Sequence, residues 1–398
     1  MLLLAACATG RPAPPATTAS AELDVLTDRL GPPMTNSSGT CPSPGKHVDQ
    51  LHPTTLPRSS WELAWTETAE GQLAEATVTP DGALWALRGT GPAQWPVQWT
   101  GSSWKKLPTF PLGKDPTVRL GAASADKAWV FVESAPPMSP EAPPATYTVS
   151  TWDGRAWRSE QVDLGAPPAR GEQPAAQGAW VLLGDRSMRW SGTAWQTAPL
   201  HSYSYKLSGS TDEPWAIASS DPDAEQGQIQ LSRWTDRGWQ AIPLPDGMLL
   251  PPGAEAPYPN RPWTRIAGVA RTGPEEFWVA STYSWVEHEQ EDVTMSRSVV
   301  TRNVAGRWSC WWGPVDRPDP FVDVVPDGRG GLWAATGSGM FWHLSDGRWT
   351  RERAPVGKGV PAITDLAASP GGEIYALGGI GSKRWAQDIR PALWRLKP

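Results

Sequence analysis

The sequence predicts an all-β protein, and specifically a seven-bladed β-propeller of four-stranded blades, from three observations. First, the 398 residues include 43 Pro and 39 Gly, so roughly one position in five is unfavourable inside a helix. Second, a repeat of about 48 residues occurs seven times. Third, the last repeat is incomplete, and a segment that matches its missing strand stands near the N-terminus.

Each repeat reads as an apolar strand, a tight turn, a second strand with an aromatic residue, a variable loop and a hairpin. The aromatic residues of the second strands are Trp85, Trp129, Trp180, Trp215, Trp278, Trp333 and Tyr375. The hairpins place two Trp around a central Gly, at Trp99 and Trp104, Trp152 and Trp157, Trp190 and Trp195, and Trp234 and Trp239. Gly supplies the positive φ of a tight hairpin, and facing Trp stabilise it across the strands. We expect these Trp to pack between blades.

The seventh repeat ends at "ALWRLKP", where Trp394 takes the first hairpin position and no second Trp follows. The segment "RSSWELAW" around Trp61 matches "GSSWKKLP" around Trp104. We therefore expect an N-terminal strand to complete the last blade, so that residues 58–398 form the closed propeller. Such closure leaves only short sheet edges exposed.

The first residues indicate export. A short apolar run ends in the letters "LAAC" at Cys7, so residues 1–6 read as a truncated signal peptide. This ending resembles the lipobox of bacterial lipoproteins, which implies that Cys7 carries lipid and anchors the chain to the cell envelope, on its periplasmic or cell-surface side. Residues 7–57 are then expected to form a lipidated disordered tether and an irregular segment. A diacylated, aminoacylated cysteine would give stable attachment.

Two cysteines remain after Cys7, at Cys41 and Cys310. An even number in an oxidising compartment favours a disulfide between them, which would tie the N-terminal segment to the outside of the propeller. Two separate buried thiols are the alternative.

The repeats resemble those of two-component-regulator-type propellers and, more weakly, the Asp-box repeats of sialidases. An Asp-box reads S/T-x-D-x-G-x-x-W, whereas residues 151–157 lack the residue between Asp153 and Gly154. The likeness covers residues 58–398 and implies a fold. It implies no activity, because no residue matches a sialidase catalytic set.

Long insertions concentrate on one predicted face, which holds the second-to-third strand loops and the connections between blades. They span residues 134–146, 220–228, 243–262, 284–298 and 379–391. Length variation on one face is typical of a binding face. Aromatic residues expected there, as a surface for protein or sugar, are Trp95, Tyr258, Trp263, Trp285 and Trp385. The alternative is that these loops fold their aromatic side chains inward.

A charged residue stands near the start of each innermost strand. These residues are Glu75, Arg119, Arg170, Lys206, Arg265, Asp323 and Asp365. They predict a bipolar channel mouth on the long-loop face, basic in repeats two to five and acidic in repeats six, seven and one. Because unpaired buried charges are costly, such residues meet water, a ligand or each other. The last case would pair Glu75 with Arg119 and Arg265 with Asp323.

Several function classes lack their usual signals. The net charge of −6 contains no block of like charge, which argues against nucleic acid, and no apolar run is long enough to span a bilayer. Walker, G-x-S-x-G and H-E-x-x-H motifs are missing, so neither a cofactor nor a metal is expected. The acidic stretch at residues 285–293 reads as a solvated loop, with a cation site as the alternative.

The sequence therefore predicts a non-enzymatic envelope lipoprotein, monomeric or part of a hetero-complex, that binds a protein or peptide through its long-loop face. The lipid would be its only membrane contact. The alternatives are a carbohydrate-binding propeller and a glycosidase or polysaccharide lyase. For the last class, Glu75, Asp323 and Asp365 are the candidate carboxylates, and hydrolysis requires two of them about 5 to 9.5 Å apart.

Overall fold

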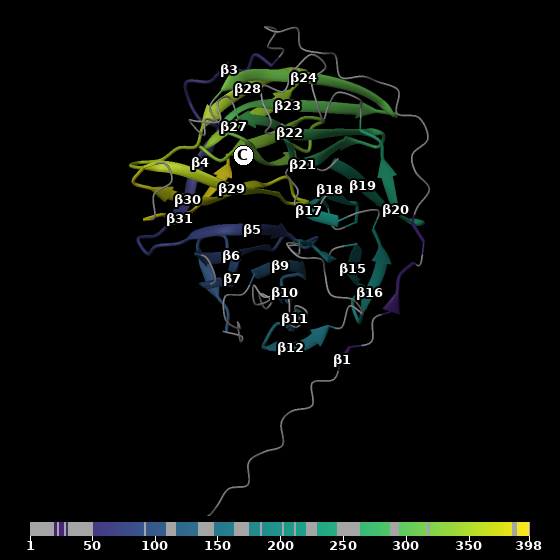
Figure 1. The fold of residues 1–398 in the computed structure, drawn as a ribbon. Helices are drawn as coiled ribbons and strands as arrows, with labels where there is room; N and C mark the ends of the chain where they lie inside the picture. The colour runs from purple at the N-terminus through teal and green to yellow at the C-terminus, as the bar shows by residue number, and fades with distance from the viewer. Residues whose placement is uncertain are drawn as a thin grey trace, which may run out of the picture.

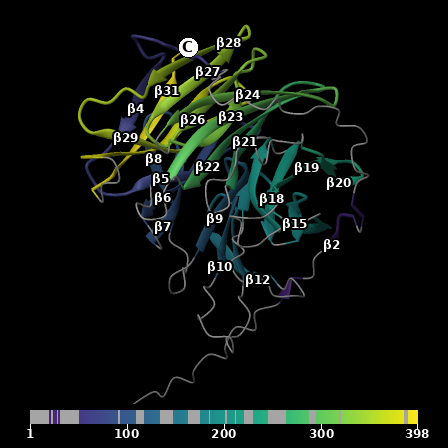
Figure 2. The ribbon, with the colours of Figure 1, turned by 45° about the horizontal axis from the view of Figure 1, so that its top comes forward.

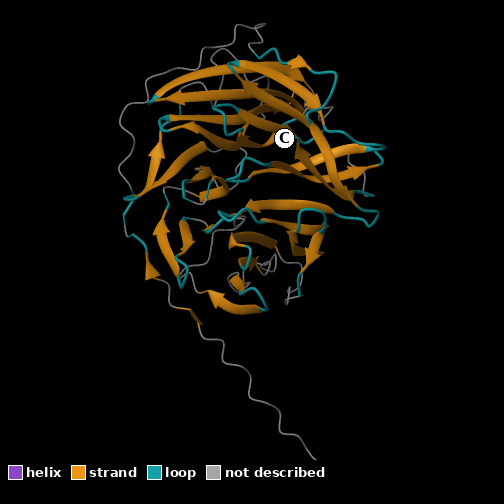
Figure 3. Cartoon of the chain, turned by 180° about the vertical axis from the view of Figure 1, so that it is seen from behind, coloured by secondary structure: helices purple, strands orange, loops and turns teal. Residues whose placement is uncertain are grey.

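The computed structural model describes residues 20–21, 24–27, 29–30, 51–90, 93–108, 117–133, 147–162, 175–183, 185–200, 203–210, 212–219, 229–244, 263–286, 294–316, 319–383 and 388–397. Within these ranges every regular element is a strand (Figure 3). The strands form seven sheets around a common centre (Figures 1 and 2). The predicted seven-bladed propeller is confirmed.

The first four blades follow the chain in order, each with its innermost strand first. Blade 1 contains β5 (Gln72–Val78), β6 (Leu84–Thr90), β7 (Ala93–Trp99) and β8 (Trp104–Lys106). Blade 2 contains β9 (Thr117–Ser124), β10 (Lys127–Glu133), β11 (Tyr147–Trp152) and β12 (Trp157–Val162). Blade 3 contains β13 (Ala175–Gln177), β14 (Trp180–Leu183), β15 (Arg186–Trp190) and β16 (Trp195–Pro199). Blade 4 contains β17 (Tyr203–Gly209), β18 (Pro214–Ser219), β19 (Ile229–Thr235) and β20 (Gly238–Ile242).

The remaining three blades complete the ring. Blade 5 has the longest strands, β21 (Trp263–Gly273), β22 (Glu276–Val286), β23 (Thr294–Val304) and β24 (Arg307–Asp316). Blade 6 contains β25 (Phe321–Pro326), β26 (Leu332–Thr336), β27 (Met340–Ser345) and β28 (Arg348–Arg353). Blade 7 contains β29 (Val360–Ala368), β30 (Ile374–Gly381), β31 (Arg390–Leu396) and β4 (Trp61–Thr66).

The ring closes through β4, which comes from the N-terminal side of the chain. It pairs antiparallel with β31, and Trp61 lies opposite Leu396. The Trp61 side chain is buried against blade 6, where it stacks on Phe341 with ring centroids 4.0 Å apart and meets the edge of Trp333. The predicted closure is confirmed, and Trp61 also packs blade 7 against blade 6.

The repeated aromatic residues pack between blades as predicted. The aromatic side chains of the second strands are all at most 6% exposed. Paired hairpin Trp face each other, for example Trp99 and Trp104 with ring centroids 5.3 Å apart. In blade 6 the hairpin turn has positive φ at both Asp346 and Gly347, which matches the twist of the flanking strands.

The N-terminal segment runs along the outer edges of the blades. Short parallel strands β1 (Ser20–Ala21), β2 (Asp24–Val25) and β3 (Thr54–Thr55) extend the sheets of blades 2, 3 and 6 respectively. Shortly before β3, the Leu51 amide donates to the Trp312 carbonyl of blade 5, and the Leu51 side chain is 1% exposed. The backbone of β1 belongs to the stretch that the sequence predicts to be a tether.

Candidate functional site

The innermost strands meet around a central channel, each beside the next from β5 through β29 and back to β5 (Figure 1). In blades 1, 4, 5, 6 and 7 the innermost strand carries a β-bulge directly before or at the charged or equivalent residue. A bulge re-aims the neighbouring side chain and is common beside functional sites. Here the bulges direct a ring of side chains into the channel.

In each blade, the Trp or Tyr of the second strand lies opposite one residue of the innermost strand. We call the residue two positions before that one the ring position. In most blades this position carries the predicted charge. Its occupants are Glu75, Arg119, Lys206, Asp323 and Asp365. Glu75 lies inside its bulge with a φ of 55°. Two blades differ, with Ala175 opposite Leu182 in blade 3 and Gly268 opposite Ala280 in blade 5.

Two of the predicted ring charges, Arg265 and Arg170, do not occupy the ring position. Arg265 lies three residues before the ring position and is exposed, so its assignment to the ring is wrong. A longer turn between the first two strands of blade 5 would have placed Arg265 in the ring, but the observed register places Gly268 there. Arg170 lies outside the described residues, and the turn of blade 3 is short, which puts Ala175 at the ring position.

The described ring charges form ion pairs across the channel. Arg119 contacts Glu75 at 3.2 Å, which is the pairing expected between blades 1 and 2. Lys206 of blade 4 reaches blade 6, where its Nζ lies 3.3 Å from Asp323 Oδ1 and donates to the Val322 carbonyl at 2.9 Å. Lys206, and not the expected Arg265, is therefore the partner of Asp323.

Asp365 and Asp323 form a carboxyl pair between blades 7 and 6. The Asp365 Oδ2 accepts from the Ala76 amide at 2.6 Å, and Asp323 Oδ2 accepts from the Leu366 amide at 3.1 Å. Burial raises the pKa of Asp365 well above its ordinary value, and the negative charge and hydrogen bond of Asp323 raise it further. Such pairs share a proton, because two adjacent carboxylates repel each other.

Burial also raises the pKa of Glu75, although Arg119 and Lys206 oppose that rise. The Glu75 and Arg119 side chains keep 26% and 20% of their surface accessible. Most of both side chains is therefore buried, and the charged form of Glu75 loses much of its hydration.

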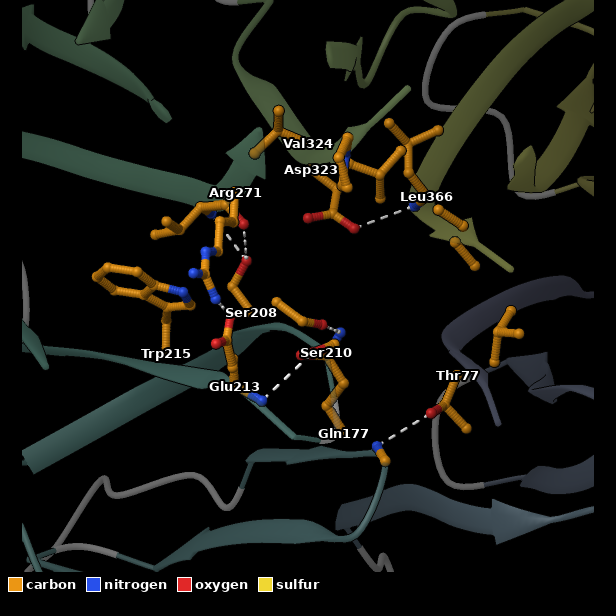
Figure 4. A pocket seen from close by; sticks show the side chains of 18 of the residues that line it. Thr77, Gln177, Ser208, Ser210, Glu213, Trp215, Arg271, Asp323, Val324 and Leu366 are labelled. Carbon is orange, nitrogen blue, oxygen red and sulfur yellow. Dashed lines mark hydrogen bonds and ion pairs between the residues drawn. The ribbon is translucent and has the colours of Figure 1, made fainter. Parts of the chain in front are cut away.

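A cavity of about 390 Å³ extends from this ring toward the short turns between first and second strands. In Figure 4 the Asp323 carboxylate points into the cavity, which Ser208, Gln177 and Thr77 also line. Asp323 is only 8% exposed. The cavity therefore has a carboxylate at its inner end and opens on the face opposite the long loops.

Polar contacts fix the shape of this cavity. The Gly178 amide donates to Thr77 Oγ1 at 3.0 Å, which joins blade 3 to blade 1 across the channel. Ser208 Oγ accepts from the Val269 amide at 2.8 Å and donates to the Val269 carbonyl, which joins blade 4 to blade 5. Because these groups belong to the innermost strands and their turns, the cavity is part of the rigid centre of the propeller.

Near the outer end of the cavity, Arg271 forms an ion pair with Glu213 (Figure 4). The other donors of Arg271 reach the carbonyls of Gly273 and Pro274, both at 2.9 Å. Asp212 also lines this end, is exposed, and forms no ion pair with a described residue. The outer end is therefore acidic.

The aromatic residues predicted for the long-loop face are only partly described. Trp95 lies on strand β7, not in a loop, and its ring packs between Arg88 and Lys106. Trp285 lies within β22 and Trp263 begins β21, so both are also strand residues. Tyr258 and Trp385 lie outside the described residues. The predicted loop placement was wrong for Trp95 and Trp285 because the strands of blades 1 and 5 are longer than their repeats suggest. Trp263 is the first residue of β21 and directly follows the predicted connection 243–262.

Cys310 is disulfide-bonded. Its predicted partner Cys41, and the lipidation site Cys7, lie outside the described residues. Across the described ranges no group of three metal-ligating side chains is suited to a metal ion, and no helix is long and apolar enough to cross a membrane.

No protein-family model matches the chain, and no curated protein matches it significantly. Among solved structures it is similar to YCF48 bound to a D1 peptide, at 14% identity and a TM-score of 0.50, over 87% of this chain and 100% of the other. It is also similar to YCF48 from Cyanidioschyzon merolae (15% identity, TM-score 0.48, 85% and 99% of the two chains). A third similar structure is the GH74 xyloglucanase of Xanthomonas campestris (16%, 0.47, 81% and 52%). The first likeness supports the propeller fold alone.

The sequence identified the charges of the ring and missed the cavity. The polar residues that line the cavity, such as Thr77 and Ser208, lie two positions after the ring charge in blades 1 and 4. That common offset is visible in the sequence. Only the register shows that it leads to the face opposite the long loops.

Proposed function

We propose that this protein is a non-enzymatic binding scaffold of the bacterial envelope, and that a polypeptide segment of its partner enters the central cavity. The cavity carries the proposal. It has about 390 Å³ of space, rigid walls from several blades, and a carboxylate at its inner end. Pockets of this size with a few convergent polar groups are the usual ligand sites of proteins.

The state of the ring carboxylates supports binding over hydrolysis. Glycoside hydrolysis needs two carboxyl groups on opposite sides of the substrate. Asp323 and Asp365 instead share a hydrogen bond, and Glu75 is paired with Arg119. The solved structure of YCF48 with a D1 peptide is consistent with a propeller that binds a peptide.

The lipid anchor at Cys7 is part of the same proposal. The first described residues after Cys7 form β1, on the outer edge of blade 2. An anchor at the rim leaves both faces of the ring open to a partner. Labelling with a fatty acid analogue tests it, because Cys7→Ser is expected to lose the label, whereas a labelled variant would exclude the anchor.

Photocrosslinking in cells tests where the partner binds. A photoreactive residue at Pro370, beside the cavity mouth, is expected to capture one partner polypeptide. The same residue at Lys383, exposed near the long loops, tests the face predicted from the sequence, and Lys105 on the outer edge is the matched control. Capture only from Lys383 would move the site to the long-loop face. Capture from neither position would contradict the proposed function.

A further inference from the structure

We propose that the cavity recognises a primary alkylammonium group, such as that of a lysine side chain, and that Asp323 is its anionic contact. This inference rests on the proposed function for its biological partner, although the chemistry of the cavity can be tested separately. Three observations lead to it: the balance of charges, the free space beside Asp323, and the apolar walls.

Among the described residues of the ring and cavity, carboxyl groups outnumber cations. The ring and cavity together contain five described carboxyl groups, Glu75, Asp212, Glu213, Asp323 and Asp365. They contain three described cations, Arg119, Lys206 and Arg271. Each cation is already paired, and the proton shared by Asp323 and Asp365 makes up part of the difference. A ligand cation would supply the missing charge.

Asp323 can accept a further donor. Its Oδ1 faces Lys206, its Oδ2 accepts from the Leu366 amide, and it shares a hydrogen bond with Asp365, while a carboxylate has about four acceptor positions. Ser208 Oγ lies close to Asp323 Oδ1, because a Cβ placed on Gly268 would approach them at 3.1 and 2.9 Å, and both residues line the cavity. Two convergent acceptors of this kind suit an ammonium group, which has three donors and no acceptor.

The cavity walls suit the methylene stem that a lysine ammonium carries. Apolar side chains lie between Asp323 and the turns, namely Val269, Val324, Val325, Leu366 and Ala367. The carboxylate of Asp212 stands nearer the mouth and attracts a cation on its way in. The combination favours an alkylammonium over a metal ion, because a metal would need several free oxygens.

Binding of a cation should release the shared proton. Asp365 is faced by Asp323 from β25 and Lys206 from β17, and it accepts from the backbone of β5 and β29. Lys206 also acts on Glu75 of β5, which pairs with Arg119 of β9. A ligand cation stabilises the ionised form of the carboxyl pair, so it lowers the raised pKa. Affinity should therefore rise with pH through the interval in which the free pair titrates, and should level off above it.

Isothermal titration calorimetry with defined amines tests the inference. Nα-acetyl-lysine methylamide should bind at least about tenfold more tightly than its Nε-acetyl form, because acetylation removes the charge. Buffers of different ionisation enthalpy should report proton release to solvent. Two further probes, an alanine peptide with a free N-terminus and free 1,5-diaminopentane, distinguish a lysine side chain from a chain terminus or a small amine.

Variants define the contact. Asp323→Asn is expected to weaken binding of the lysine probe at least about tenfold. Asp365→Asn should keep binding but lose the proton release, and Asp346→Asn in the exposed hairpin is the matched control. If Asp323→Asn fails to fold, Gly268→Ala provides the same test, because its Cβ would crowd Asp323 Oδ1. Equal affinity for charged and acetylated probes would overturn the inference.

The two proposals can fail separately. Crosslinking from Pro370 without any preference for lysine would keep the scaffold function and reject the ammonium site. Tight binding of the lysine probe without capture of a partner polypeptide from Pro370 or Lys383 would keep the ammonium site and reject the scaffold function.

Discussion

At the scale of single residues, the centre of the protein depends on which side chains occupy the ring position. Gly268 is as important there as the charges, because a Cβ at this position would lie 2.9 Å from Asp323 Oδ1 and 3.1 Å from Ser208 Oγ. The sequence could predict the charges from their common spacing before the strand Trp. It could not predict that blades 3 and 5 contribute small residues, because that depends on turn length and strand register.

The carboxyl pair gives a prediction about stability and pH. The pKa of Asp365 is raised in the folded protein, so the folded state binds more protons than the unfolded state once pH exceeds the ordinary value of 3.8. As pH rises from 3.8 to the raised pKa, Asp365 therefore lowers the free energy of unfolding. Above the raised pKa this loss of stability is constant. Asp365→Asn, which stays neutral, is expected to increase stability at pH 7 relative to wild type and to lose this advantage near pH 4.

Urea unfolding of both proteins between pH 4 and pH 8 measures this difference. Asp346→Asn, at an exposed turn, should show the wild-type pH dependence. A stability difference between wild type and Asp365→Asn that does not vary with pH would mean that Asp365 titrates normally.

At the scale of elements, the N-terminal segment is the least predictable part of the fold. Its composition predicts a tether, yet β1, β2 and β3 pair parallel with the outermost strands of blades 2, 3 and 6. Two-residue strands have no alternating pattern to detect. The propeller hairpins, in contrast, were predictable because each repeats a Trp pair around a turn with positive φ.

Leu51 tests whether this segment is part of the folded domain. Its side chain packs in the core shared by blades 5 and 6, so Leu51→Ala should destabilise the protein by about 2 to 5 kcal/mol. Leu30, which is 40% exposed, is the matched control, and Leu30→Ala should change stability little. Thermal unfolding of the two variants provides the comparison. Equal melting temperatures would show that the segment does not contribute to the core.

At the scale of the whole molecule, closure by β4 turns seven weakly repeated sheets into one rigid ring. The incomplete seventh repeat and the matching segment around Trp61 made this closure predictable from the sequence. The cavity was not predictable, since it results from how seven innermost strands approach one another. Its opening on the face opposite the long loops separates the two candidate binding faces of the molecule.

Trp61 joins the two ends of the chain, so its loss should affect the entire ring. Trp61→Ala removes the stacking on Phe341 and is expected to cost about 3 to 5 kcal/mol. Trp157, which is only half-buried on the outer strand of blade 2, is the control and should cost less when replaced by Ala. Urea unfolding is the measurement. A smaller effect for Trp61 than for Trp157 would contradict the role of β4 in closure.

The carboxyl pair at the inner end of the cavity can be observed directly by carbon NMR of protein labelled with ¹³C at its aspartate carboxyl groups. The Asp323→Asn and Asp365→Asn variants assign the two signals. We predict that the pair titrates with one pKa well above the ordinary value, and that Nα-acetyl-lysine methylamide lowers that pKa. Two signals that titrate at ordinary values and do not respond to the lysine probe would contradict the account.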